Sequence, residues 1–90
     1  MMSLLFLLIL LGLPVQATQD PEAHIQKAKD RLKKRDYEGT TSILNHLMRE
    51  HKRSPQAIQA KIVMGDMFFQ KQEWDAARVY YQQFLKDHLF

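Results

Sequence analysis

Cysteine is absent from this sequence of 90 residues. Its absence excludes disulfide bonds, thiolate metal sites and thiol nucleophiles together. The length allows one domain at most, and exported domains this small are commonly held together by disulfides. We therefore expect the fold to depend on helix packing, on a partner or on oligomerisation.

Glycine and proline are scarce, and no segment after Asp20 has the pattern of a β-strand. Beyond that residue, proline occurs only in the pairs Asp20-Pro21 and Ser54-Pro55. An Asp or Ser N-cap followed by Pro at the first helical position favours a helix start. The sequence therefore predicts that a helix begins at each pair.

Apolar residues recur at helical spacing in four segments, at about 21–35, from 36, at 55–71 and from 73. Their connections are short, so consecutive helices should be antiparallel neighbours. We predict an all-α fold of two antiparallel helical hairpins. The side chains expected on the packing faces are Ile25, Ala28, Leu32, Tyr37, Thr40, Ile43, Leu44, Leu47, Met48, Ile58, Ile62, Gly65, Phe68, Phe69, Trp74, Ala77, Tyr80, Tyr81, Phe84 and Leu85.

The N-terminal segment is apolar and carries no charged side chain. Its continuous apolar run, residues 4–13, is too short to cross a bilayer as a helix and fits the central region of a secretory signal. Small residues at Val15 and Ala17 predict cleavage after Ala17. We expect a signal peptide at 1–17, a helical domain at 18–90, and export to the periplasm or beyond. Because no Lys or Arg precedes the run, an uncleaved membrane anchor is the alternative.

The formal charge of +3 is concentrated in the first predicted helix, around 27–35. Such a basic surface can attract nucleic acid or anionic lipid. Nucleic-acid binding is not expected, because Asp30 and Asp36 interrupt the basic run and no aromatic side chain is interleaved for base stacking. A membrane-surface protein, with the anchor retained and this helix on anionic headgroups, is the second functional hypothesis.

The two halves of the helical region align when one is shifted by 37 positions. In this register Ile25 matches Ile62, and Ala28 matches Gly65. Further along the chain, Leu32 matches Phe69, Tyr37 matches Trp74, Thr40 matches Ala77, Leu44 matches Tyr81, Leu47 matches Phe84 and Met48 matches Leu85. A fixed period of this length indicates a repeated helical hairpin, with repeats at about 21–53 and 54–88.

The second half resembles a tetratricopeptide repeat. The resemblance rests on the small residues Gly65 and Ala77 and on the aromatic residues Phe68, Trp74, Tyr81 and Phe84. The segment from Ser54 is similar to periplasmic tetratricopeptide proteins of bacterial envelopes, including outer-membrane assembly factors and Tol–Pal-associated proteins. The first half departs from the pattern, because Arg31 stands where the second half has Phe68, and Thr40 where it has Ala77.

No constellation of residues predicts catalysis or metal binding. His46 and His51 are five residues apart, about 140° around a helix, so they should not face one ligand. His46 and Glu50 share a face but lack a third ligand. The acidic pairs at 36/38 and 73/75 are explained by helix capping. We therefore expect neither an enzyme nor a cofactor or metal site.

The resemblance implies a protein-binding adaptor of the cell envelope, because tetratricopeptide proteins bind peptides along the surface of their first helices. Carried over by position, this surface consists of Lys29, Leu32, Lys33, Gln59, Ile62, Asp66, Phe69 and Gln70. The expected partner is another protein or peptide, or a second copy of this chain, and the lysines suit an acidic segment or a C-terminal carboxylate. Only about two repeats are present, where three or more are usual, so a truncated remnant of a longer repeat protein is a further alternative.

Overall fold

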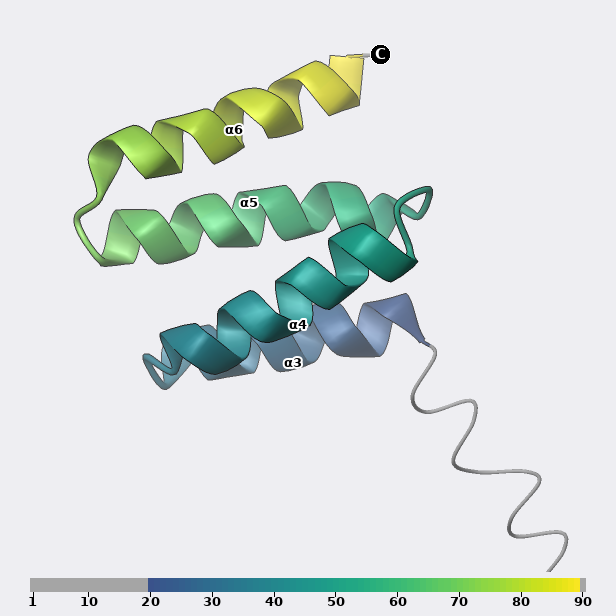
Figure 1. Ribbon diagram of the computed structural model, residues 1–90, viewed down its shortest axis with the longest axis horizontal. Coiled ribbons are helices and arrows are strands. Elements are labelled where there is room, and N and C mark those ends of the chain that lie inside the picture. The colour runs from purple at the N-terminus through teal and green to yellow at the C-terminus, as the bar shows by residue number, and fades with distance from the viewer. Residues whose placement is uncertain (1–19, 90) are drawn as a thin grey trace, which may run out of the picture.

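In a computed structural model of the protein, which describes residues 20–89, the chain forms four α-helices (Figure 1). They are α3 (Pro21–Lys33), α4 (Tyr37–Glu50), α5 (Pro55–Gln70) and α6 (Trp74–Leu89). The all-α prediction is confirmed, with α3 packed on α4 and α5 packed on α6. The predicted signal peptide or anchor at 1–17 lies outside the described residues. In the described part of the chain, no helix combines the length and apolar character needed to cross a membrane.

Two of the helices begin as their capping pairs predict. The Asp20 carboxylate accepts a hydrogen bond from the Glu22 amide at 3.0 Å, and the Ser54 hydroxyl accepts one from the Ala57 amide at 3.1 Å. In both helices proline follows the cap, at a position whose missing N–H costs no intrahelical bond. A cap of this kind stabilises a helix by about 1 kcal/mol.

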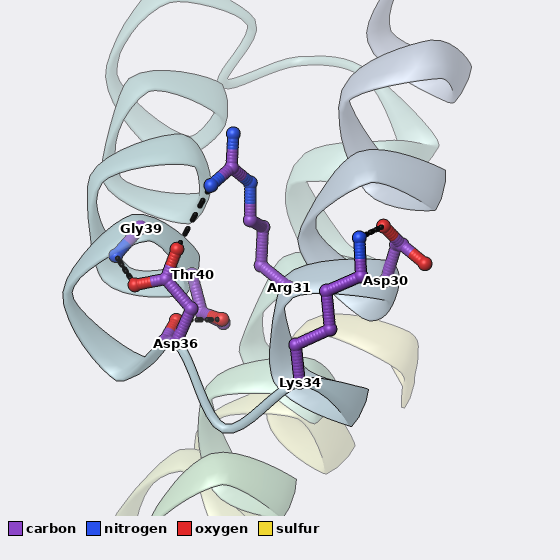
Figure 2. Close-up of polar contacts among 6 residues, drawn as sticks. All are labelled: Asp30, Arg31, Lys34, Asp36, Gly39 and Thr40. Carbon is purple, nitrogen blue, oxygen red and sulfur yellow. Dashed lines mark hydrogen bonds and ion pairs between the residues drawn. The ribbon is translucent and has the colours of Figure 1, made fainter.

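Asp36 starts α4 and also joins it to α3 (Figure 2). One carboxylate oxygen accepts a hydrogen bond from the Gly39 amide at 3.0 Å, and the other accepts one from the Arg31 guanidinium at 2.9 Å. The Asp36 main-chain carbonyl accepts a hydrogen bond from the Thr40 hydroxyl at 2.7 Å. The Gly39 amide, followed by the Arg31 side chain, holds the pKa of Asp36 below its ordinary value. The hydrogen bond to the Asp36 carbonyl gives the Thr40 hydroxyl a partner at a position with no solvent exposure.

The turns that close the two hairpins share one backbone conformation. In the first, the Asp36 amide donates to the Arg31 carbonyl, and Arg35 adopts a left-handed φ of 60°. In the second, the Glu73 amide donates to the Phe68 carbonyl, and Gln72 has a φ of 64°. This is the Schellman pattern, which satisfies the last carbonyls of a helix. The same hydrogen bonds thus recur 37 residues apart, the interval of the sequence register. The left-handed turn also ends α3 two residues before the expected 35.

The core lies among α3, α4 and α5. Its buried members are Ile25, Ala28, Leu44, Leu47, Ala60, Val63, Met64 and Met67. Partly buried side chains, including Leu32, Ile43 and Phe68, pack against it. The two halves are also joined at the surface, where the Gln56 amide group donates to the Glu22 carboxylate at 3.1 Å and the Lys71 ammonium lies 5.5 Å from the centre of the Tyr37 ring.

The expected packing faces of α5 and α6 are partly wrong. On α5 the buried face is formed by Ala57, Ala60, Val63, Met64, Gly65 and Met67, whereas Phe69 is 57% exposed. On α6 only Ala77 is buried, and Trp74 and Leu85 are each 55% exposed. α5 lies between α6 and the α3–α4 pair, so it is covered on two sides (Figure 1). α6 packs mainly on α5, which leaves much of its apolar surface open.

Candidate functional site

A groove runs between α3 and α5 and ends at the start of α6. It encloses about 890 Å³. α3 contributes three side chains from its second half, α5 contributes six, and the turn and the first residue of α6 contribute one each. The lining residues of this α3–α5 groove are Lys29, Leu32, Lys33, Gln59, Ile62, Val63, Asp66, Phe69, Gln70, Gln72 and Trp74.

The structure brings all eight residues of the predicted binding surface together in this groove. It adds Val63, Gln72 and Trp74, which the sequence reasoning did not place there. The sequence predicts Trp74 on a packing face, but its side chain is 55% exposed. The left-handed turn at Gln72 instead leads the chain into α6 so that Trp74 begins the helix at the end of the groove.

The apolar part of the groove is accessible to a ligand. Leu32 and Ile62 are half-buried, so each offers part of its surface, and Val63 is buried beneath them. At one end, the rings of Phe69 and Trp74 meet edge to face with their centres 5.0 Å apart. Exposed large side chains held in a fixed geometry lose little conformational entropy when a partner covers them.

The polar part of the groove carries charges of both signs on opposite helices. Lys29 and Lys33 are exposed on α3, and Asp66 is exposed on α5. Asp66 accepts a hydrogen bond from the Tyr81 hydroxyl of α6 at 2.5 Å. Burial of the phenol, with the hydrogen bond to this carboxylate and its charge, raises the pKa of Tyr81 to about 12. Because Asp66 is already engaged by α6, the two lysines are the charges best placed to meet a ligand.

The close approach of α5 and α6 behind the groove depends on Gly65. A Cβ atom at this position would lie 2.5 Å from Cε1 of Tyr81 and 2.7 Å from its Cδ1. No side chain can be accommodated there unless the Tyr81 ring moves. The small residue therefore leaves room for the Tyr81 ring against α5, where its hydroxyl donates a hydrogen bond to the Asp66 carboxylate.

Three histidines gather away from the groove, near the end of α4. The rings of His24 and His46 stack with centres 5.1 Å apart, and the His51 ring lies 6.1 Å from His24 and 5.9 Å from His46. The five-residue spacing would point the side chains of His46 and His51 in different directions only if both residues lay on one continuous helix. Here α4 ends at Glu50, and His51 turns back with φ −128° and ψ 40°. His24 comes from α3, and no sequence signal pairs it with the other two.

Comparisons with known proteins identify no relative: no protein-family model, no curated protein and no solved structure matches this chain. The family resemblance of the sequence is therefore not confirmed. What is shown is a small all-helical domain of four helices that pack as two pairs.

Proposed function

We propose that the protein is an exported, non-catalytic adaptor of the cell envelope, built as a tetratricopeptide-like module, whose α3–α5 groove binds an acidic peptide segment. The observation that carries this proposal is the groove itself. Its position along the first helices of the two hairpins matches the surface that the family resemblance implies. Export is inferred from residues 1–17 alone.

The helix arrangement supports the tetratricopeptide-like interpretation. α3 contacts α5 as well as α4, so the first helices of the two hairpins lie next to each other and form one surface. Consecutive hairpins stacked in this way create the extended binding surface of helical repeat proteins. The shared turn geometry, repeated after 37 residues, indicates that the hairpins are equivalent units.

The chemistry of the groove favours an acidic ligand with apolar side chains. Leu32, Ile62 and the Phe69–Trp74 pair offer apolar contact. Lys29 and Lys33 lie beside them, two turns or less from the end of α3. A carboxylate on the ligand, from Asp, Glu or a free C-terminus, would meet these ammonium groups, and attraction of this kind sets specificity and association rate more than affinity.

The membrane-surface alternative receives less support. A helix that lies on a bilayer needs a free apolar face. In α3 the apolar side chains Ile25 and Ala28 are fully buried against the other helices, and Leu32 is half-buried. Two basic side chains, Arg31 of α3 and Lys34 just after its end, are also paired, with Asp36 and Asp30 respectively.

Trp74 provides the assay, because it is the only tryptophan in the chain and it lines the groove. Its fluorescence would be followed while two synthetic peptides of equal length are added, one of alternating Leu and Glu and one of alternating Leu and Lys. We expect the acidic peptide to change the emission and to saturate, and the basic peptide to have little effect. Equal binding of both peptides, or of neither, would contradict the proposal.

A charge-reversal pair separates groove binding from general electrostatic attraction. The double variant Lys29→Glu, Lys33→Glu should weaken binding of the acidic peptide by about tenfold or more, because attraction is replaced by repulsion. Lys27→Glu is the matched control: it is exposed on the same helix but does not line the groove, so it should have little effect at physiological salt. If Lys27→Glu weakened peptide binding as much as Lys29→Glu or Lys33→Glu alone, the result would show that only the net charge of the chain matters.

Self-association is the remaining alternative. A photo-crosslinking residue at Phe69, which is exposed and lines the groove, would report what occupies it in the cell envelope. Cross-links confined to a second copy of this chain would identify the groove as a dimer interface, and the adaptor proposal would then be abandoned.

A further inference from the structure

The three histidines near the end of α4 form a cluster drawn from three places in the chain. His24 lies in the first half of α3, His46 in the second half of α4, and His51 just beyond the end of α4. Each is partly exposed, so solvent and solutes reach the cluster. The groove residues of α3 lie in the other half of that helix, from Lys29 onward, so the cluster is not part of the groove.

The spacing of the rings is close to that of imidazoles around one metal ion. In a four-coordinate site the metal–nitrogen distance is about 2.0–2.1 Å, which places the ring centres of neighbouring histidines roughly 5 Å apart. The observed separations are 5.1, 5.9 and 6.1 Å. The centres of the three rings therefore lie within about an ångström of the separations expected around one ion.

The hydrogen bond of His24 prepares that ring as a ligand. Its Nδ1 lies 2.8 Å from the main-chain carbonyl of Asp20. A carbonyl oxygen can only accept, so Nδ1 carries a proton, and in the neutral ring Nε2 is the nitrogen with the free lone pair. Metal-binding histidines characteristically donate their other ring N–H to a backbone carbonyl or a carboxylate, which fixes the tautomer and the ring orientation. The Asp20 carbonyl is itself held in place, because it also accepts the His24 amide at 3.3 Å in the first turn of α3.

We propose that His24, His46 and His51 bind one divalent transition-metal ion of the type that prefers imidazole, Zn²⁺ or Ni²⁺. As the side chains stand in residues 20–89, no three potential ligands are arranged to hold a metal ion. His24 keeps its hydrogen bond to the Asp20 carbonyl, so the His46 ring, which is stacked on it at an angle of 25°, must turn until a nitrogen of each ring faces a common point. Rotations of partly exposed side chains take place within nanoseconds.

Metal binding at this cluster would tie the start of α3 to the end of α4. Three protein ligands leave the fourth position of a tetrahedral ion for water or for a group from another molecule. Because the ion binds only the folded arrangement, it should stabilise the first hairpin in proportion to its concentration.

The test is a titration of the purified chain, freed of metal with EDTA and dialysed, with Zn²⁺ and separately with Ni²⁺. Affinity would be measured by calorimetry and the melting temperature by circular dichroism. We expect one ion per chain and a rise in Tm of about 10 °C or more at a metal concentration 100 times Kd. We expect the affinity to fall by at least about tenfold in each of three variants, His24→Gln, His46→Gln and His51→Gln. Tenfold is the lower end of the loss seen when a group that only orients a metal ligand is removed.

His88→Gln is the matched control. His88 lies on α6, where its ring stacks on Phe84 with centres 5.6 Å apart, so its removal should leave metal affinity unchanged. All four variants should show the helical spectrum of the parent in the absence of metal, since the substituted rings are partly or fully exposed. The proposal would be overturned if the chain bound no metal ion. It would also be overturned if only one of the three cluster variants lost binding, or if His88→Gln lost it equally. None of these results depends on the peptide groove.

Discussion

Gly65→Ala is the substitution that most directly tests the packing of α5 on α6. The added Cβ would lie 2.5, 2.7 and 3.0 Å from three atoms of the Tyr81 ring, which is closer than carbon atoms pack. Overfilling of a packed site costs about 1–3 kcal/mol. Alanine recovers about 0.5–1 kcal/mol of this, because it is a better helix former than glycine. We therefore expect a net destabilisation centred on about 1 kcal/mol, within a range of about 0–2.5 kcal/mol.

Urea denaturation followed by circular dichroism would measure the change in free energy, and thermal denaturation should show a fall in Tm of roughly 4–8 °C for each kcal/mol lost in a domain of this size. The Tyr81→Ala background supplies the control. There the ring is absent, so Gly65→Ala should become stabilising by about 0.5–1 kcal/mol. A reversal of sign between the two backgrounds would identify the ring contact as the cause. If Gly65→Ala stabilises the protein while Tyr81 is present, the close packing of the two helices is not as described.

Three further predictions concern turns and titrations. Gln72→Gly should raise the free energy of unfolding by about 0.5–1 kcal/mol in urea, because glycine adopts the left-handed φ of 64° without strain. The lowered pKa of Asp36 means that it stabilises the fold above its ordinary value of 3.8 and that this contribution is lost as pH falls; the difference in Tm between the parent and Asp36→Asn should therefore shrink below pH 3.8. The raised pKa of Tyr81, about 12, gives the opposite sign: its contribution is present below pH 10 and is lost as pH rises toward 12. Absorbance at 295 nm should show one tyrosine that ionises late, and Asp66→Asn should bring its pKa down.

Helix starts were predictable because their signals are local. Asp20-Pro21 and Ser54-Pro55 place a side-chain acceptor and a fixed φ next to each other in the chain, and both form the expected caps. Asp36 has no proline after it, but an acidic residue at the start of the second apolar segment predicts a cap there, and the structure confirms it as the cap of α4. The end of α3 was placed two residues late, because Arg35 gives no sign in the sequence that it would adopt a left-handed conformation.

The packing face of α5 was not predictable from periodicity. Apolar residues surround this helix, with Ile58, Ile62 and Phe69 on one side and Ala60, Val63 and Met67 on another. A helix covered on two sides has no single apolar stripe, so the spacing rule selects no unique face. The buried face combines the small residues Ala57, Ala60 and Gly65, which allow neighbouring helices to approach closely, with larger apolar side chains such as Met64 and Met67, whereas Phe69 is exposed.

The groove and the histidine cluster differ in how far sequence could reach them. The eight predicted groove residues were taken by position from the tetratricopeptide pattern that the sequence resembles, which assigns them to the first helices of the two hairpins, and all eight line the groove. No such pattern relates His24 to His46. Their contact depends on where α3 and α4 cross, and the position of His51 depends on where α4 ends. Contacts of this kind follow from tertiary packing, which no local pattern encodes.

The two hairpin turns show what the repeat preserves. In the first, Arg31 crosses the turn to pair with the Asp36 carboxylate at 2.9 Å. In the second, the equivalent Phe68 instead stacks on Tyr80, with ring centres 5.6 Å apart and nearly parallel planes. The side-chain contacts thus differ completely, and yet the backbone hydrogen bonds of the two turns coincide. The turn is therefore set by the helix end and its left-handed residue, and the side chains at these positions are free to vary. This explains how two halves that differ at this position, with Arg31 in one and Phe68 in the other, close their hairpins with the same backbone turn.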